Sequence, residues 1–352
     1  MSPVPAPVRI GIVGSGSMAE YHVKKFAALP GVLVSACSDR HAAHASDFAR
    51  RLRIPRWFAS ARELAGSGEV DCAATAVVDS GHEAAALAIL QKGLPVFAEK
   101  PLARTVSECE QLLAASRAAG VPAVVNFSKR NAPAAGLARR LVADGRIGRV
   151  TGGSFTYFQS WLLQDSWGRW DVTPRLRWRL SPGTSTDGVI GDLLSHLIDL
   201  VRFVLGEIEF ATCAATFLTP DPDLPDSPGA ADTCAAQFRL RSHAIISARA
   251  SWRAAGYLDA LTFALEGDAG SITADLAASR DTVKLRATAD ADWTVIHAEP
   301  CLSTYEQFIS AVRGGERAGP CFEDGVAVQR VIESCARASR DDVPGGFGAA
   351  IT

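Results

Sequence analysis

The sequence predicts an α/β N-terminal domain with a doubly wound (Rossmann) parallel sheet, followed by an α+β domain with a large, mainly antiparallel open sheet. Short apolar runs alternate with amphipathic segments up to residue 127, and successive strand-like segments dominate after about residue 150. At roughly 100–200 residues per domain, 352 residues suit two domains. We therefore expect a first domain at 1–128, a second domain at 129–340, and a tail at 341–352.

The first domain is predicted from strands that are apolar throughout. Such strands are buried on both faces, as in a parallel sheet covered by helices. The expected strands are 8–13, 32–38, 72–78, 95–99 and 122–127, with helices near 17–29, 41–52, 81–93 and 104–119. This alternation of strand and helix is typical of a doubly wound fold.

The second domain follows a different pattern. A helix at 132–144, a strand at 150–162 and a helix at about 188–205 precede seven segments with alternating apolar and polar residues between 208 and 298. Alternation indicates an antiparallel sheet with one face covered. We expect a surface loop at 220–232 and two closing helices at 302–313 and 323–339.

Composition excludes several classes of protein. The net charge of −2 gives no chain-wide attraction to nucleic acid or to acidic membranes. No run approaches the roughly 20 apolar residues of a membrane span, and the N-terminus lacks the features of a signal peptide. The eight cysteines show no metal-ligand spacing, so we expect buried thiols in a reducing cytoplasm and no metal site.

Residues 14–19, Gly-Ser-Gly-Ser-Met-Ala, have the form GxGxxA between an apolar strand and a helix. Gly14 permits the tight turn, and Gly16 lets the backbone approach a pyrophosphate. The N–H groups of Ser17 and Met18 would then face the phosphates at the helix N-terminus. The loop therefore predicts a dinucleotide site, although a glycine-rich turn without a ligand would look the same.

Asp39 ends the next strand, 25 residues after Gly14. A carboxylate there accepts hydrogen bonds from a ribose diol and repels a 2′-phosphate, which favours NAD. Arg40 could instead stack on adenine or pair with a 2′-phosphate, so NADP remains an alternative.

Further candidates lie where the later strands of the first domain end. Ligands of open parallel sheets bind at these carboxyl ends. Lys100, in Glu99-Lys100-Pro101, could hold a substrate hydroxyl, and Asn126 could contact the nicotinamide ribose. His82 begins a helix near the cofactor's far half, where a plain surface histidine is equally compatible. The expected cofactor contacts beyond the loop are Asp39, Arg40, Thr75, Asp79, His82, Glu99, Lys100 and Asn126.

Three motifs together carry a resemblance to a known family. GSGSMA (14–19), AVVDSGH (76–82) and EKPLA (99–103) resemble the family of glucose–fructose oxidoreductase and inositol 2-dehydrogenase (Gfo/Idh/MocA), over roughly residues 8–340. The resemblance implies an NAD(P)-dependent oxidoreductase acting on a secondary alcohol of a sugar or cyclitol. It also implies that Lys100 is catalytic.

Asp192 and His196 are four residues apart in a predicted helix and so share one face. Because imidazole titrates near neutral pH, His196 could take the proton of an alcohol as its hydride leaves. An ordinary surface pair is the alternative. The segment resembles the family's Asp-x-x-x-His motif, which implies an active-site role for both residues and a structural role for Asp199.

Candidate substrate contacts come from aromatic and polar residues of the second domain. Residues 157–162 (Tyr-Phe-Gln-Ser-Trp-Leu) and 178–180 (Trp-Arg-Leu) look like segments of family members that act on sugars or cyclitols. Aromatic faces would stack on a sugar ring, while amide and guanidinium groups would bind its hydroxyls. The candidates are Lys100, Arg130, Tyr157, Gln159, Trp161, Trp178, Arg179, Asp192 and His196, although both tryptophans could be core residues.

The sequence departs from the family pattern at two places. Val77-Val78-Asp79 replaces the usual Thr-Pro-Asn, and Leu194 replaces a glycine near His196, so the resemblance constrains the reaction class more than the shape of the substrate pocket. An NAD-dependent glycosidase and a non-catalytic sugar- or dinucleotide-sensing regulator are alternative functions. The open sheet usual in the family implies a homodimer or homotetramer.

Overall fold

The computed structural model describes residues 6–221, 223, 229–316 and 319–340, so the expected tail and much of the expected loop at 220–232 lie outside the described residues. The chain divides into two compact units. The first unit comprises the residues up to Phe127 together with Leu302–Gln329, and the second comprises Ser128–Cys301 with the residues from Arg330 on. Residues 302–329, expected in the second domain, therefore lie in the first unit.

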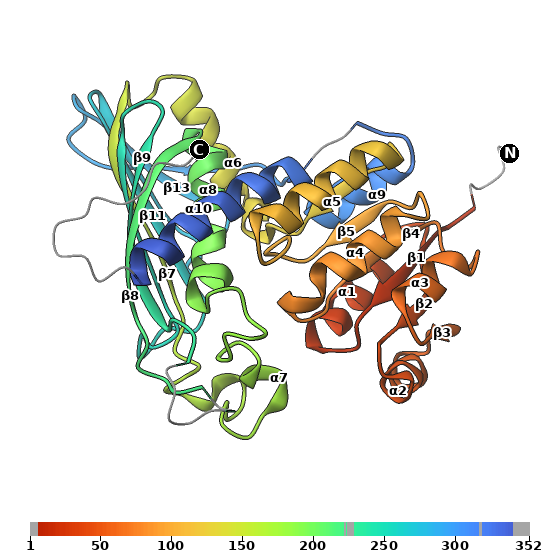
Figure 1. The fold of residues 1–352 in the computed structure, drawn as a ribbon. Coiled ribbons are helices and arrows are strands. Elements are labelled where there is room, and N and C mark those ends of the chain that lie inside the picture. Colours follow the sequence, from red (N-terminus) through yellow and green to blue (C-terminus); the bar gives the residue numbers. More distant parts are fainter. Residues whose placement is uncertain (1–5, 222, 224–228, 317–318, 341–352) are drawn as a thin grey trace, which may run out of the picture. The chain divides into compact units, whose positions relative to one another are not determined.

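The first unit contains a six-stranded parallel sheet of order β3-β2-β1-β4-β5-β6 (Figure 1). The strands are β1 (Val8–Val13), β2 (Val32–Ser38), β3 (Arg56–Phe58), β4 (Cys72–Thr75), β5 (Val96–Ala98) and β6 (Ala123–Val125). The strand order reverses beside β1, which creates the crevice where such folds bind ligands. The predicted doubly wound fold is confirmed; β3 was not predicted.

The helices of this unit are α1 (Ser17–Ala27), α2 (Ala42–Leu52), α3 (Ala61–Gly66), α4 (His82–Leu90), α5 (Val106–Ala119) and α9 (Thr304–Val312), with a 3-10 turn, η1, at Asp79–Gly81. Of these, α1, α2 and α9 share one hydrophobic core with the sheet. Phe308 of α9 packs against Phe26 and Phe97, with ring centroids 6.3 and 5.5 Å apart. All three rings are fully buried, and this explains why α9 belongs to the first unit.

The second unit contains an eight-stranded sheet of order β14-β13-β12-β11-β7-β10-β9-β8. The strands are β7 (Val150–Phe158), β8 (Ile208–Thr216), β9 (Thr233–Leu240), β10 (Ile245–Ser251), β11 (Ala260–Gly267), β12 (Gly270–Asp275), β13 (Thr282–Ala287) and β14 (Thr294–His297). Neighbours are antiparallel except β7 and β10, which are parallel. The predicted open sheet is confirmed.

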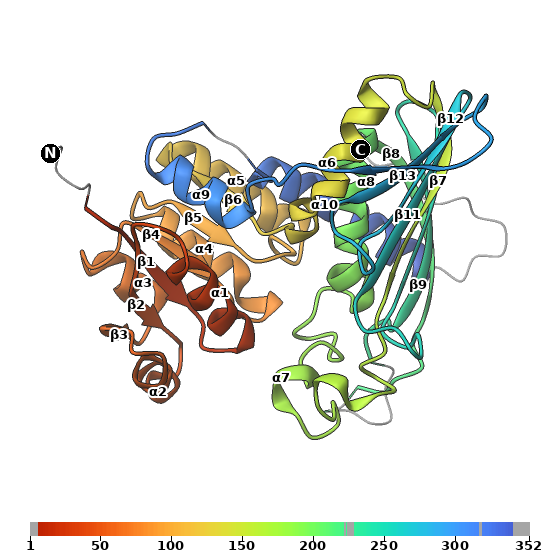
Figure 2. The same cartoon turned by 180° about the vertical axis from the view of Figure 1, so that it is seen from behind.

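Helices cover one face of this sheet (Figures 1 and 2). They are α6 (Pro133–Ala143), α8 (Ser195–Leu205) and the part of α10 (Phe322–Arg340) from Arg330 on. Shorter elements are η2 (Ser128–Asn131), η3 (Asp165–Trp167), α7 (Pro174–Arg177) and the π-helical turn η4 (Ile190–Leu194). Buried and exposed residues alternate along β9, as expected for a sheet with one covered face.

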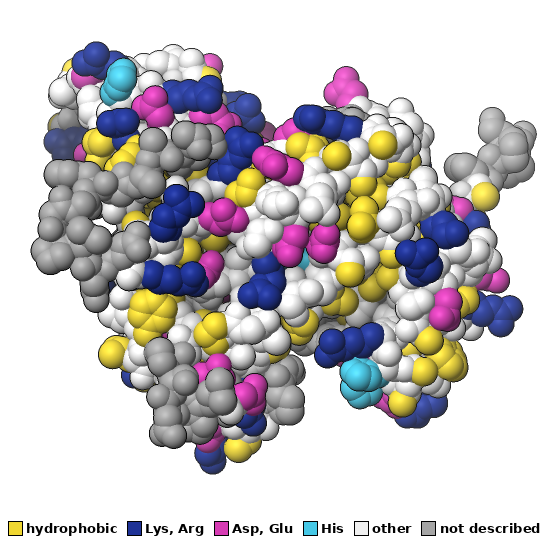
Figure 3. All heavy atoms as spheres, in the orientation of Figure 1, with side chains coloured by type: hydrophobic (Ala, Val, Ile, Leu, Met, Phe, Trp, Pro, Cys, Tyr) yellow, Lys and Arg dark blue, Asp and Glu magenta, His cyan; other side chains and the backbone are white. Residues whose placement is uncertain are grey.

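Surface properties agree with the small net charge. Acidic and basic side chains are interspersed over the face shown in Figure 3. Within the described ranges, none of the helices combines the length and the apolar character that crossing a bilayer requires.

Candidate active site

The turn between β1 and α1 has the geometry expected of a phosphate-binding loop. Gly14 has φ of +107°, and a Cβ there would lie 2.2 Å from the carbonyl oxygen of Ala76, so only glycine fits. Gly16 is the N-cap of α1 without a side-chain cap, and a Cβ at Gly16 would meet nothing within 4 Å. The helix N-terminus is therefore open to an anion, as NAD binding requires.

Asp39 lies beside this loop, as predicted. Its Oδ2 accepts a hydrogen bond from Ser15 Oγ at 2.6 Å, and its Oδ1 accepts one from the backbone N–H of His41 at 2.9 Å. Arg40 is exposed, as are Ser17 and Met18 of the loop. The carboxylate thus joins the end of β2 to the glycine loop, next to the open helix terminus.

His82 is buried rather than lying on the surface. Its Nδ1 lies 2.6 Å from the carbonyl oxygen of Pro101, and its Nε2 lies 3.1 Å from that of Val77. The ring therefore joins the turn after β4 to the turn that carries Lys100. Asp79 is buried in η1, and Thr75 is buried at the end of β4. The Lys100–Pro101 peptide bond is cis.

A buried set of side chains lies behind the Lys100 turn; we call His22, Glu99, Asn126, Thr304 and Tyr305 the Glu99 network. Glu99 Oε1 lies 3.1 Å from His22 Nε2 and accepts from Asn126 Nδ2 at 2.7 Å. His22 Nδ1 lies 2.9 Å from the Tyr305 hydroxyl, and Asn126 Oδ1 accepts from Thr304 Oγ1 at 2.9 Å. Glu99 Oε2 accepts from the backbone N–H of Lys100 at 3.2 Å.

The electrostatics of this network favour an ionised Glu99. Burial raises the pKa of Glu99, but the adjoining His22 and the hydrogen bond from Asn126 lower it below the ordinary value. Burial also raises the pKa of the Tyr305 phenol, with the charge of Glu99 as a further cause. Glu99 and Asn126, predicted as cofactor contacts, are thus bonded to other side chains. Sequence reasoning missed His22 and Tyr305, which lie on α1 and α9 and belong to no motif.

In the second unit, Asp192 lies in the π-helical turn that leads into α8. Two glycines permit this turn: a Cβ at Gly188, which has φ of +61°, would lie 2.3 Å from the Ala231 carbonyl oxygen, and one at Gly191 would lie 1.9 Å from that of Thr186. Single π-helical turns are rare and occur often at functional sites.

Asp192 and His196 differ in their accessibility. The Asp192 side chain is 24% exposed, while His196 is buried. Asp192 Oδ2 accepts from Trp252 Nε1 at 3.1 Å and lies 4.0 Å from Arg179 Nε. Since Asp192 is fixed by the indole yet keeps contact with solvent, it can also bind a ligand hydroxyl.

Beside His196 is a group that we call the Tyr157 cluster: Lys129, Tyr157, Gln159 and Asp259. The ring of Tyr157 lies 6.0 Å from that of His196, edge to face. Its hydroxyl donates to Asp259 Oδ1, and Lys129 Nζ lies 3.2 Å from Asp259 Oδ2. Sequence reasoning found Tyr157 and Gln159 but missed Lys129 and Asp259, which belong to no motif.

Arg130 and Trp161, two of the predicted substrate contacts, have structural partners. Arg130 Nε and Nη2 donate to Asp199 at 2.8 and 2.5 Å, and Asp199 is fully buried, which suits the structural role expected for it. Trp161 is 2% exposed and packs on Trp252, with ring centroids 5.1 Å apart, so the structure favours its core alternative.

Trp178, by contrast, is only partly buried, and the Arg179 guanidinium lies 4.6 Å from the centroid of its ring.

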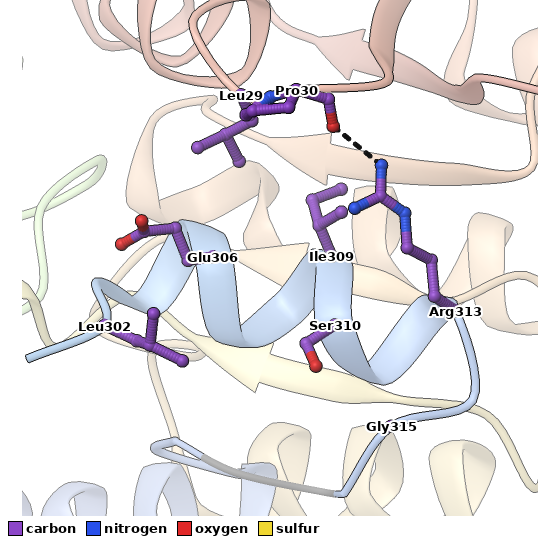
Figure 4. A pocket seen from close by; sticks show the side chains of 8 residues that line it. All are labelled: Leu29, Pro30, Leu302, Glu306, Ile309, Ser310, Arg313 and Gly315. Carbon is purple, nitrogen blue, oxygen red and sulfur yellow. Dashed lines mark hydrogen bonds between the residues drawn. The ribbon is translucent and has the colours of Figure 1, made fainter. Parts of the chain in front are cut away.

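A pocket of about 470 Å³ in the first unit is a different feature (Figure 4). It is lined by Leu29, Pro30, Leu302, Glu306, Ile309, Ser310, Arg313 and Gly315. Its Pro30 lies two residues before β2, at the amino end of the sheet, whereas the glycine loop follows the carboxyl end of the parallel strand β1. Arg313 donates to the Pro30 carbonyl oxygen at 2.8 Å (Figure 4). Because ligands of this fold bind at the carboxyl ends of strands, this pocket is not the candidate active site. Within the described residues, no group of His, Cys, Asp and Glu side chains could hold a metal ion.

Comparison with known proteins agrees with this geometry. The chain is 25% identical over 393 residues to levoglucosan dehydrogenase of Pseudarthrobacter phenanthrenivorans, covering 96% of this chain and 98% of the relative. It is 28% identical over 334 residues to inositol 2-dehydrogenase 2 of Saccharopolyspora erythraea, covering 93% and 92%. A solved structure of levoglucosan dehydrogenase with NADH and levoglucosan matches its fold with a TM-score of 0.85 at 21% identity, covering 98% of this chain and 99% of that one.

Two family models match most of the chain. Residues 8–127 match the oxidoreductase family with an NAD-binding Rossmann fold, and residues 136–291 match the GFO/IDH/MocA C-terminal domain. The chain therefore belongs to the Gfo/Idh/MocA family of NAD-binding oxidoreductases.

Proposed function

We propose that this oxidoreductase transfers a hydride between NAD and a secondary alcohol of a sugar or cyclitol, with Lys100, Asp192 and His196 as its catalytic residues. The observation that carries the proposal is the pairing of a partly exposed Asp192 with His196 at a π-helical turn, beside the polar Tyr157 cluster. Relatives named for levoglucosan and inositol support an alcohol substrate rich in hydroxyls.

The residues of the chain have distinct roles in this proposal. The pyrophosphate would be held by the glycine loop, through Gly14, Gly16, Ser17 and Met18. Asp39 would bind the adenosine ribose. NAD supplies the hydride acceptor when bound. His196 takes the proton of the reacting hydroxyl, and Lys100 donates a hydrogen bond to its oxygen.

Asp192 has a positioning contact as well as a substrate contact. Its carboxylate accepts from Trp252, which fixes its direction, and would accept from a substrate hydroxyl with its remaining capacity. Trp178 and Arg179 would contact the sugar ring, with Tyr157 and Gln159 nearby. Other predicted neighbours of the cofactor are Arg40, Thr75, Asp79 and His82. Use of NADP would depend on Arg40.

A screen of NAD and NADP reduction over a panel of sugars and inositols tests this function. We expect steady NADH formation with at least one polyol. Cleavage of a glycoside without net NADH would instead support the glycosidase alternative. Tight NAD binding with neither reaction would support a sensing regulator.

We also propose a cytoplasmic homodimer or homotetramer formed through the uncovered face of the eight-stranded sheet. Ala235, Gln237 and Arg239 of β9 are exposed on this face, and Ile245 of β10 is 50% exposed. Light scattering of the purified protein tests the assembly, and a monomer at micromolar concentration would contradict it.

A further inference from the structure

Asp259 lies at the edge of the eight-stranded sheet where the strand that carries Tyr157 ends. The parallel strands β7 and β10 end together, where Ser251 pairs with Phe158. Antiparallel β11 begins at this edge, where Ala260 pairs with the same Phe158, and Asp259 immediately precedes it. Asp259 therefore lies at the strand ends that carry Tyr157, whose ring contacts His196.

Three side chains converge on the Asp259 carboxylate. The Tyr157 hydroxyl donates to Oδ1, Gln159 Nε2 lies 3.4 Å from Oδ1, and Lys129 Nζ lies 3.2 Å from Oδ2. The Lys129 ammonium also lies 4.6 Å from the centroid of the Tyr157 ring. Lys129 is 15% exposed, whereas Asp259 is 55% exposed. The partners are thus largely buried while the carboxylate itself faces solvent.

Protonation states in the cluster follow from these contacts. Burial raises the pKa of the Tyr157 phenol well above its ordinary value, and the charge of Asp259 raises it further. Partial burial raises the pKa of Asp259, but the Lys129 charge and the hydrogen bond from Tyr157 lower it overall. Near neutral pH the phenol therefore stays protonated and donates a hydrogen bond to a carboxylate anion.

This arrangement leaves hydrogen-bond acceptors facing outward. A carboxylate offers about four acceptor positions, and the Asp259 carboxylate, which is 55% exposed, keeps part of this capacity on the solvent side. Lys129 adds a buried positive charge that keeps the carboxylate ionised. Such a site suits a hydroxyl that donates a hydrogen bond, and a polyol carries several hydroxyls beside the one that reacts.

We propose that Asp259, positioned by Lys129 and Tyr157, is a specificity-determining residue that accepts a hydrogen bond from a second, non-reacting hydroxyl of the substrate. This inference rests on the proposed function, because the reacting hydroxyl is assigned to His196. Lys129 acts through Asp259 and is a positioning residue. The substrate class is thereby narrowed to alcohols with at least two hydroxyls.

The test compares Asp259→Asn with wild type on the polyol that gives NADH and on its monodeoxy analogues. A hydrogen bond to a charged group predicts a loss of about 10- to 100-fold in kcat/KM for the parent polyol. One analogue, which lacks the recognised hydroxyl, should be used almost equally by both proteins. Glu266→Gln is the matched control, since it removes a carboxylate from the other end of β11. Lys129→Met should reproduce the pattern of Asp259→Asn more weakly.

The proposed function and this inference fail in different ways. If wild type forms NADH from no polyol, the proposed function falls and the inference falls with it. If wild type forms NADH but Asp259→Asn affects the parent and all analogues equally, only the inference is overturned. An unchanged kcat/KM for Asp259→Asn on every substrate would overturn it as well.

Discussion

The Glu99 network of the first unit and the Asp192–His196 site of the second use the same chemical groups in different surroundings. In the first, an imidazole, a carboxylate and a phenol are bonded to one another and buried, with Glu99 7% exposed and His22 0%. In the second, His196 and Tyr157 are buried, but Asp192 and Asp259 are 24% and 55% exposed.

This difference in exposure indicates which polar clusters can bind and act on a substrate. Where a carboxylate is buried and hydrogen-bonded only to protein groups, the cluster stabilises the fold. Removing one member then leaves a buried charge without its partner. Where the carboxylate keeps access to solvent, it can exchange water for a substrate hydroxyl. Mutations in a buried cluster should therefore lower the stability of the fold, and mutations in a solvent-accessible cluster should lower turnover.

The largest expected effect is on turnover in the second unit. His196→Asn should lower kcat by about 10²–10⁴, the usual range for removal of an acid–base group. NAD affinity should change no more than a few-fold, because the predicted NAD contacts lie in the first unit. Steady-state kinetics and calorimetric NAD titration measure both quantities. The exposed His44, replaced in the same way, is the control, and unchanged kcat for His196→Asn would remove His196 from the mechanism.

His22→Leu should act on stability. It leaves Glu99 buried without its imidazole partner, and breaking a buried pair costs about 3–5 kcal/mol. Urea unfolding followed by circular dichroism measures the free energy of unfolding. His44→Leu, at an exposed position of α2, should change it by less than about 0.5 kcal/mol. A loss of less than about 1 kcal/mol for His22→Leu would show that the network contributes little to the fold.

How far the sequence predicted these two regions depends on the range of the interactions. The parallel strands and the glycine loop follow from local patterns, and their fold was confirmed. The short β3 carries no apolar run and was missed. The position of α9 depends on Phe308 meeting Phe26 and Phe97, which are 282 and 211 residues away in sequence.

The candidate site shows the same limit. Lys100, Asp192 and His196 belong to motifs, so they could be named without a structure. Their partners belong to no motif and could not be named: Trp252, which follows β10, donates to Asp192, and Asp259, which precedes β11, accepts from Tyr157. The protein partners of His82 and Arg130, two backbone carbonyls and Asp199, are likewise visible only in the folded chain, while their predicted ligand contacts stay predictions.

Asp39 shares features of both kinds of carboxylate: both its oxygens accept hydrogen bonds from protein groups, yet it borders the open glycine loop. Asp39→Ala should weaken NAD binding by about 10- to 100-fold, the value of a hydrogen bond to a charged group. NADP binding should fall less, because the repulsion of a 2′-phosphate is relieved at the same time. Fluorescence titration with both cofactors measures the ratio, and equal losses would mean that Arg40 sets the preference.

The ionisation of Glu99 gives a smaller effect that depends on pH. Its folded-state pKa is lowered, so its contribution to stability is present above the ordinary glutamate pKa of about 4.3 and is lost as the pH falls below it. The gap in unfolding free energy between wild type and Glu99→Gln should therefore narrow in acid, by at most about 1.4 kcal/mol per pH unit. Unfolding curves measured between pH 7 and the acid limit of the fold test this. A gap that widens in acid would mean that Glu99 is protonated in the native protein.

The smallest expected effect comes from removing helix caps in the first unit, and it tests whether the Glu99 network affects stability alone or turnover as well. Ser303, which directly precedes Thr304 of the Glu99 network, is the N-cap of α9 and forms a capping box with Glu306. Ser60 caps α3, away from the network, and is the matched control. Both serine-to-alanine changes should cost about 1 kcal/mol of unfolding free energy and leave kcat unchanged. If kcat falls only in Ser303→Ala, the Glu99 network also sets the position of Lys100 through its backbone contact with Glu99, and the division between a structural and a chemical cluster would not hold.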